Sequence, residues 1–258
     1  MNYSVVVMSC DSYSDLWTPF IKCFERYWPT CNAPVYLVSE TLTSDSSLFY
    51  KSITCGAGTV WTDRLDICLD MIETEYVILL CEDYLLCDQI DNEMINSLLQ
   101  LADRFNIGNL RMLPNPKAAI LFSDKYELGE YPKFTQYRIA MQVGIWRSDF
   151  LRKFRGMNTN AWGFERLGSR ISNKFDEKLV CTLRQRFPFE DAVHKGKWDH
   201  SGIRLCERNN IIIDFSKRKS MRHIDYLVKH GKGIIIDVAP NFVGNIMNIF
   251  SKLNRLFR

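Results

Sequence analysis

Short apolar runs and amphipathic stretches alternate through the first hundred residues of the chain. The runs are too short for helices and predict strands buried on both faces, at residues 3–10, 33–40, 51–55 and 76–81. Apolar side chains at helical spacing predict helices at residues 16–27, 61–72 and 91–105. Strands and helices that alternate in this way build a mostly parallel sheet flanked by helices. The pattern therefore predicts the α/β class, with a nucleotide-binding half at the N-terminus.

The second half of the chain has shorter and less regular patterns. We expect strands at residues 110–113, 118–122, 138–146, 179–184, 210–214 and 233–238. A short basic helix is expected at 149–154, and 158–170 is a polar segment that contains a tryptophan. From Val243 onward, one apolar stripe faces a side rich in Asn, Lys and Arg, which predicts a basic amphipathic helix over 241–258.

Composition narrows the class of protein. The 258 residues are 47% hydrophobic, which excludes a disordered chain, and a net charge of +3 is too small to favour nucleic acid as a partner. The nine cysteines contain no Cys-x-x-Cys pair, and several lie in apolar patterns, so we expect core thiols and a reducing cytosol. No secretory signal and no membrane-spanning segment are evident in the sequence.

Two carboxylates, Glu82 and Asp83, follow the most apolar of the predicted strands directly. Ligands of open α/β sheets bind beyond the carboxyl ends of the strands, so this pair indicates a site. Carboxylates hold a divalent cation such as Mn²⁺ or Mg²⁺ against diphosphate oxygens, or face the ribose of a nucleotide. The alternative is that the pair caps the turn or binds a lysine.

Several short motifs occur in a characteristic order. They are Trp61–Leu65, Glu82–Tyr84, Gln142–Trp146, Trp162–Glu165 with Gly168–Ser169, and Lys195–Trp198. In order and spacing this set resembles the GT-A glycosyltransferases of bacterial capsule, O-antigen and other surface-polysaccharide clusters, over most of residues 1–215. The usual acidic motif of that group is Asp-x-Asp, whereas Tyr84 and Leu85 follow Asp83 here. Metal-independent transfer is therefore an alternative to a metal site at Asp83.

The resemblance implies a Rossmann-like GT-A domain over residues 1–240, with a nucleotide-sugar half at 1–108 and an acceptor half at 109–240. It also implies an inverting transfer, which needs a carboxylate to take the proton of the acceptor hydroxyl. Glu165 is our candidate for this base. Its alternative is a surface residue paired with Arg166 or Arg170, and Glu190 and Asp191 are rival carboxylates.

Other candidates would contact the donor. Arg64 reaches a diphosphate in one interpretation and pairs with Asp63 or Asp66 in the other. Asp11 either contacts the uracil or ribose of the nucleotide or caps a helix. His194, Lys195 and Lys197 either close over the diphosphate or form a solvated charged run.

Aromatic residues supply candidate surfaces for sugar rings. Trp146, Trp162 and Trp198 either stack on sugars or belong to the core, where large aromatics are more frequent. The basic segment 217–219 is either plain surface or meets an anionic acceptor or a membrane. The C-terminal helix either packs on the protein or lies on the inner face of the cytoplasmic membrane, where a polyprenyl-diphosphate-linked acceptor would be found.

The sequence therefore predicts a cytoplasmic glycosyltransferase that uses a nucleotide-sugar donor, with UDP-sugars favoured, and a glycan acceptor. A nucleotidyltransferase on a doubly wound sheet is one alternative, although the chain has neither a Gly-x-Gly-x-x-Gly motif nor a P-loop. A catalytically silent carbohydrate-binding or assembly subunit is another.

Overall fold

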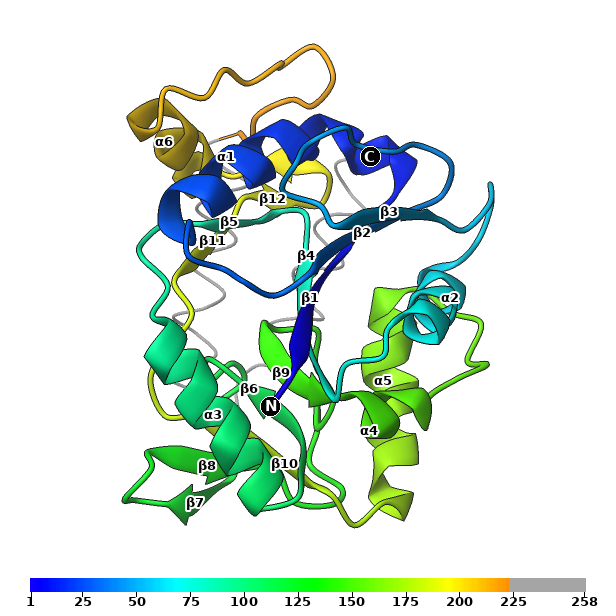
Figure 1. Ribbon diagram of the computed structural model, residues 1–258, viewed down its shortest axis with the longest axis vertical. Helices are drawn as coiled ribbons and strands as arrows, with labels where there is room; N and C mark the ends of the chain where they lie inside the picture. Colours follow the sequence, from blue (N-terminus) through cyan, green and yellow to red (C-terminus); the bar gives the residue numbers. More distant parts are fainter. Residues whose placement is uncertain (223–258) are drawn as a thin grey trace, which may run out of the picture.

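One nine-stranded sheet forms the centre of the protein, in the order β3-β2-β1-β4-β9-β6-β10-β8-β7 (Figure 1). The computed structural model describes residues 1–222. The strands of this sheet are β1 (Tyr3–Met8), β2 (Val35–Ser39), β3 (Lys51–Thr54), β4 (Tyr76–Cys81), β6 (Ile107–Arg111), β7 (Ile120–Ser123), β8 (Leu128–Glu130), β9 (Gly144–Arg147) and β10 (Lys178–Thr182). Strands β1 to β4 are parallel to one another, as the alternating pattern predicts. Strand β9 is antiparallel to both β4 and β6.

Helices cover both faces of the sheet (Figure 1). They are η1 (Asp11–Leu16), α1 (Trp17–Tyr27), α2 (Trp61–Met71), α3 (Asn92–Arg104), α4 (Ser148–Arg152), α5 (Ala161–Ile171), η2 (Ser172–Lys174) and α6 (His200–Arg208). Side chains alternate along β1: Val5 and Val7 join the core under α1 and α3, whereas Val6 and Met8 join the core under α2, α4 and α5. The chain is therefore a three-layer α/β/α structure.

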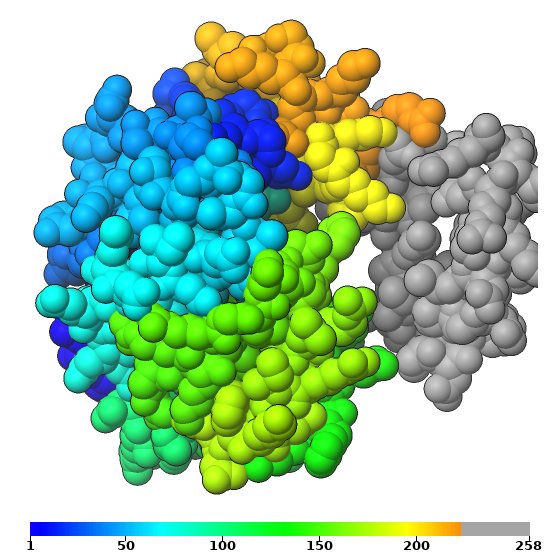
Figure 2. All heavy atoms as spheres, turned by 90° about the vertical axis from the view of Figure 1, so that its right-hand side faces the viewer, coloured from blue at the N-terminus to red at the C-terminus, as the bar shows by residue number. Residues whose placement is uncertain are grey.

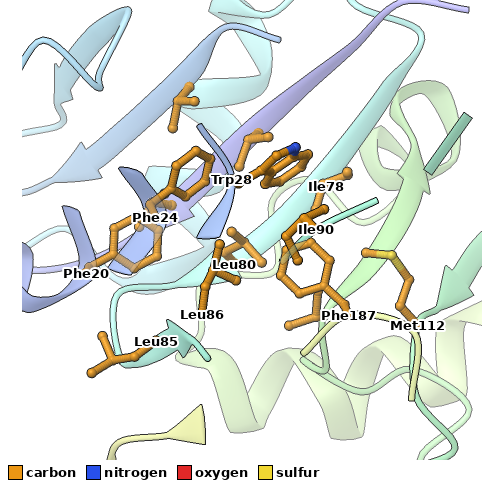
Figure 3. Close-up of a cluster of buried hydrophobic side chains, with 14 of the residues drawn as sticks. Phe20, Phe24, Trp28, Ile78, Leu80, Leu85, Leu86, Ile90, Met112 and Phe187 are labelled. Carbon is orange, nitrogen blue, oxygen red and sulfur yellow. The ribbon is translucent and has the colours of Figure 1, made fainter. Parts of the chain in front are cut away.

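The core under α1 holds the segment that follows β4 in place. Phe20, Phe24 and Trp28 lie at helical spacing on the buried face of α1, and they pack against Leu80 and Phe187 (Figure 3). The rings of Trp28 and Phe187 meet edge to face with centroids 5.7 Å apart. This packing fixes the end of β4, so the turn that carries the acidic pair projects from a rigid base.

Two small antiparallel sheets lie beyond the main sheet. The first joins β5 (Tyr84–Leu86) to β11 (Phe189–Asp191), and the second joins β12 (Val193–His194) to β13 (Lys197–Trp198). The apolar pattern predicts none of these four strands, because each spans only two or three residues, and β5 and β11 are also distant in the chain. It does not predict α6 either.

The predictions for the second half need correction. Of the predicted strand 138–146, only residues 144–146 are extended in the sheet, as part of β9, because Arg138 is buried and donates to the backbone oxygens of Tyr131 and Ser172 instead. Residues 211–214 form no strand. The segment 158–170 contains helix α5. The predicted strand 233–238 and the amphipathic helix 241–258 lie outside the described residues.

All nine cysteines are free thiols, which confirms that they form no disulfide framework. Cys23 and Cys68 are fully buried among apolar side chains. Within residues 1–222, no helix combines the length and the apolar character that crossing a bilayer requires.

Candidate active site

The acidic pair forms the turn between β4 and β5. Strand β4 ends at Cys81 and β5 begins at Tyr84, so Glu82 and Asp83 lie at the carboxyl edge of the sheet. Strand β5 pairs with β11 in a register that sets Asp191 opposite Tyr84, and the Ala192 N–H donates to the Asp83 carbonyl (2.9 Å). One of the rival carboxylates, Asp191, is therefore brought to the same edge as Asp83.

Glu165 reaches this edge from helix α5. Its Oε1 accepts a hydrogen bond from the Met141 N–H (2.7 Å), while the Met141 carbonyl accepts one from the Tyr84 hydroxyl (2.7 Å). A single residue of the loop before β9 therefore connects Glu165 to the segment that carries Asp83. The predicted alternative, a surface ion pair of Glu165 with Arg166 or Arg170, does not occur among the described residues.

The carboxylates of Asp83, Asp191 and Glu165 all act on groups at the junction of β4 and β5. Burial raises the pKa of the Tyr84 hydroxyl well above its ordinary value, and the charges of Asp83, Asp191 and Glu165 raise it further. The same three carboxylates, together with Glu82, act on the Cys81 thiol in the same direction. Residues separated by more than eighty positions in sequence therefore form one acidic site at the end of β4.

The half-buried position of Glu165 makes its carboxylate more basic. Burial raises the pKa of its carboxyl above 4.5, the ordinary value for glutamate, and the Met141 N–H and the charge of Arg111 oppose this rise. A carboxylate with a raised pKa is a stronger proton acceptor, which suits a general base. Among residues 1–222, its second oxygen, Oε2, receives no hydrogen bond, so that atom is open to a substrate hydroxyl.

Glu82 lies beneath the site, which corrects the prediction that it contacts the donor. Its side chain is buried, and burial followed by the charge of Asp83 raises its pKa well above the ordinary value. Arg218 and Arg64 act in the opposite direction but more weakly. A side chain that is buried in this way is not exposed at the surface where a donor would bind.

Replacing Glu82 with Gln is expected to stabilise the ligand-free protein at pH 8. A raised folded-state pKa gives stability that is complete below the unfolded-state value and is lost as the pH rises through the folded-state value. The variant has no such loss, so its melting temperature should exceed that of the wild type by about 2 °C or more at pH 8 and by less at pH 5. Thermal unfolding at both pH values tests this, with exposed Glu25→Gln as control. Equal gains at the two pH values would contradict it.

Arg64 is buried near the ends of β2 and β4 rather than exposed on α2. Its guanidinium donates to the Thr59 carbonyl and pairs with Glu40 (3.4 Å), so the predicted pairing with Asp63 or Asp66 is wrong. Its Nε is buried and has no partner in the described chain. An unpaired buried N–H of a charged side chain is unfavourable unless a ligand accepts from it.

Arg218 binds η1, so this residue of the segment 217–219 is not plain surface. Its side chain is buried and binds both oxygens of Asp15, with two distances of 2.9 Å. It also donates to the carbonyls of Ser12 and Gly196 and lies 4.1 Å from the ring centroid of Tyr13. The segment after α6 is thus fastened to the loop after β1.

The hairpin β12–β13 carries the predicted donor contacts His194 and Lys197. Its turn residues Lys195 and Gly196 have φ of 51° and 73°, the positive values that a type I′ turn needs. His194 and Lys197 face each other across the hairpin, and the bond from Arg218 holds its tip beside η1. The described part of the hairpin lies above a notch in the surface, opposite the segment that contains α5 (Figure 2).

Asp11 supports the loop after β2 and is occupied within the protein. Its two carboxylate oxygens accept from the N–H groups of Thr41 (3.0 and 3.1 Å) and Leu42 (3.1 Å), and its own N–H donates to Glu40 (3.1 Å). Slight burial raises the pKa of its carboxyl, but the bonds from Thr41 and Leu42 outweigh this and lower it. Asp11 is the first residue of η1 and Cys10 is its cap, so the predicted helix cap is wrong. The predicted nucleotide contact stays a prediction.

The predicted sugar-stacking tryptophans separate into two kinds. Trp146 is 0% exposed and packs against Phe150 and Phe164, so its predicted contact with substrate is wrong. Trp198 is also buried. Trp162, in the first turn of α5, is 77% exposed and lines a surface cavity together with Glu165. Only Trp162 of the three has the free ring face that stacking requires.

The donor set around Asp83 suits a cation that is shared with a diphosphate. Within residues 1–222, no three His, Cys, Asp or Glu side chains are grouped as a complete metal site. Mg²⁺ and similar cations are nevertheless held by one or two carboxylates while phosphate oxygens and water complete the shell. Asp83 and Asp191 are the carboxylates at this edge of the sheet that fit this arrangement, whereas Glu82 is buried.

The detectable similarities of this chain to known proteins are to solved structures. No family model matches the chain, and no curated protein matches it. Among solved structures, *S. aureus* TarS 1–349 in complex with UDP matches with a TM-score of 0.48 and 13% identity, over 94% of this chain and 74% of that one. The first listed structure, TarS 1–349, is 12% identical with a TM-score of 0.47, and the chain spans 59% of its length.

The similar solved structures also include a synthetase. A CMP-2-keto-3-deoxy-manno-octonic acid synthetase complexed with CTP matches with a TM-score of 0.46 and 12% identity, over 81% of this chain and 98% of that one. The sheet of the present chain combines a parallel Rossmann-like set, β1 to β4, with an antiparallel β9 inserted before β6. The mixed, mostly parallel sheet and its flanking helices confirm the predicted α/β class for residues 1–222.

Proposed function

We propose that the chain is a glycosyltransferase that moves a sugar from a nucleotide diphosphate donor, with UDP-sugars favoured, to a hydroxyl of a glycan. The observation that supports this proposal is the connection of Glu165 to Tyr84 through Met141, which links this half-buried carboxylate to the segment that follows Asp83. The acceptor would be lipid-linked and met at the cytoplasmic face of the membrane, in surface-polysaccharide synthesis.

The residues of the site divide the chemistry between them. Glu165 would take the proton of the acceptor hydroxyl while that oxygen attacks the anomeric carbon, and the bond from that carbon to the diphosphate breaks with inversion. Asp83, with Asp191, would hold a divalent cation whose charge stabilises the leaving diphosphate. The buried guanidinium of Arg64, which has an unpaired Nε, supports binding of an anion at the ends of β2 and β4.

A screen of melting temperatures tests donor binding and metal together. The wild-type chain should be stabilised by one class among UDP-, GDP-, CMP- and dTDP-sugars, and more strongly when Mn²⁺ is present. A ligand at a hundred times its Kd adds about 2.7 kcal/mol to the free energy of unfolding. Asp83→Asn should lose the Mn²⁺-dependent part, whereas Asp88→Asn, at an exposed position beyond β5, should keep it. Absence of stabilisation by every donor would overturn the proposal.

A nucleotidyltransferase is the second candidate, because acidic groups at the carboxyl edge of such a sheet also serve transfer of a nucleotide monophosphate. That reaction needs no base beside an acceptor sugar. The half-buried Glu165, with an oxygen open to a hydroxyl, therefore favours glycosyl transfer.

A further inference from the structure

A surface cavity of about 720 Å³ opens next to Glu165. The loop 134–137 forms one side and helix α5 forms the other. The aromatic and basic side chains that line it are those of Phe134, Tyr137, Trp162, Arg166 and Arg170. Its size lies within the range of about 300–1,000 Å³ that is typical of small-ligand sites. None of the steps assigned to Asp83 or Arg64 uses this space.

Three large aromatic side chains border the cavity and are exposed. Phe134 is 85% exposed, Trp162 is 77% exposed and Tyr137 is 56% exposed. Scattered exposed aromatics are ordinary, but three around one cavity form a patch that needs an explanation. The flat, weakly polar faces of sugar rings pack on such aromatic surfaces.

The loop that carries two of these rings is fixed before any ligand arrives. Phe134 and Tyr137 have φ of 70° and 51°, a left-handed conformation that is rare for bulky residues and clusters at ligand clamps. Buried Arg111 donates to the backbone carbonyls of Tyr137 and Arg138, and the Phe134 N–H donates to Asn173 (2.8 Å). These bonds hold the rings apart from the core and facing outward.

The cavity also carries uncompensated positive charge. Arg166 and Arg170 lie one turn apart on α5, line the cavity and form no ion pair within residues 1–222. The single acidic side chain among the lining residues, Glu165, is bound to the Met141 N–H. Guanidinium groups bind carboxylates and phosphates in two-pronged hydrogen bonds. The cavity is therefore complementary to a ligand that combines sugar rings with an anionic group.

We infer that this cavity is the acceptor subsite for an acidic saccharide, with sugar rings on Trp162 and the loop aromatics and a carboxylate or phosphate on Arg166 and Arg170. The reacting hydroxyl then points at Oε2 of Glu165. This inference rests on the proposed function, because it takes Glu165 as the base of the transfer.

Calorimetric titration of the full chain, with UDP and without it, tests the subsite. The probes are a uronic-acid-containing tetrasaccharide, its carboxyl-reduced neutral counterpart and a phosphorylated saccharide of the same length. At least one acidic probe should bind the wild type at least tenfold more tightly than the neutral one. The acidic probe that binds shows whether the anionic group of the ligand is a carboxylate or a phosphate.

Matched variants separate the two parts of the subsite. Trp162→Ala should weaken binding of the acidic probe at least tenfold, and Arg166→Gln with Arg170→Gln should reduce its affinity to that of the neutral probe. Tyr50→Ala and Arg26→Gln, exposed residues of the same kinds on other faces, should bind as the wild type does. Equal affinity for acidic and neutral probes, or unchanged binding by Trp162→Ala, would overturn the inference.

The outcomes also distinguish this inference from the proposed function. If the chain binds an acidic saccharide but no nucleotide sugar stabilises it, the saccharide-binding subsite is supported and the proposed transfer is contradicted. If a nucleotide sugar stabilises the chain but no acidic saccharide binds, only the inference of the acidic-saccharide subsite is contradicted.

Discussion

Replacing Glu165 with Gln is expected to lower kcat for sugar transfer about 10²–10⁴-fold, the usual contribution of a general base. The amide keeps the size of the side chain and still accepts from the Met141 N–H, so the fold and donor binding should persist. Initial rates of nucleoside diphosphate release, with the donor found by the melting screen and an oligosaccharide acceptor, measure the loss.

The pH dependence gives an independent sign of the same base. Because burial raises the pKa of Glu165 above 4.5, kcat/KM should fall on the acidic side at a pH above that value. Asp191→Asn and Glu190→Gln are the matched variants, since side chains alternate along β11 and only Asp191 lies opposite Tyr84. If Glu165→Gln retains the turnover of the wild type, Glu165 is not the base.

Replacing Arg218 with Met is expected to destabilise the protein by about 3 kcal/mol. The substitution removes the partner of a buried carboxylate, and such a change typically costs about 3–5 kcal/mol. Asp15 and Arg218 have side chains 11% and 7% exposed, so water compensates little for the loss. Urea unfolding followed by circular dichroism measures the change in the free energy of unfolding.

A double-mutant cycle separates the ion pair from the other bonds of Arg218. Asp15→Asn combined with Arg218→Met should cost less than the sum of the two single variants, because neither charge is then left alone. Lys217→Met, at the exposed neighbouring position, should change stability by no more than about 0.5 kcal/mol. Additive costs in the cycle would contradict a coupled pair.

The N-terminal half of the fold was predictable because its signals are local. Strands β1, β2 and β4 are buried on both faces, so each is a continuous apolar run, and α1 shows its buried face as a regular spacing of Phe20, Phe24 and Trp28. The abrupt end of β4 at the acidic pair was also visible in the sequence.

The remaining parts of the site depend on contacts that no local pattern records. Asp15 and Arg218 are 203 positions apart, and in sequence Arg218 is one residue of a short basic run. Asp191 reaches the site only through its register with Tyr84, which is set by a three-residue strand. For Trp146 the sequence suggested a contact with substrate that the fold does not allow. Its side chain is buried because β9 lies inside the sheet.

Phosphorus NMR of the products tests the central claim most directly. The wild-type chain, given the stabilising nucleotide sugar, Mn²⁺ and an acidic oligosaccharide, should release a nucleoside diphosphate, and Glu165→Gln should release it at least a hundredfold more slowly. Formation of pyrophosphate from a nucleoside triphosphate and a sugar acid, or equal release of diphosphate by the variant, would contradict the account.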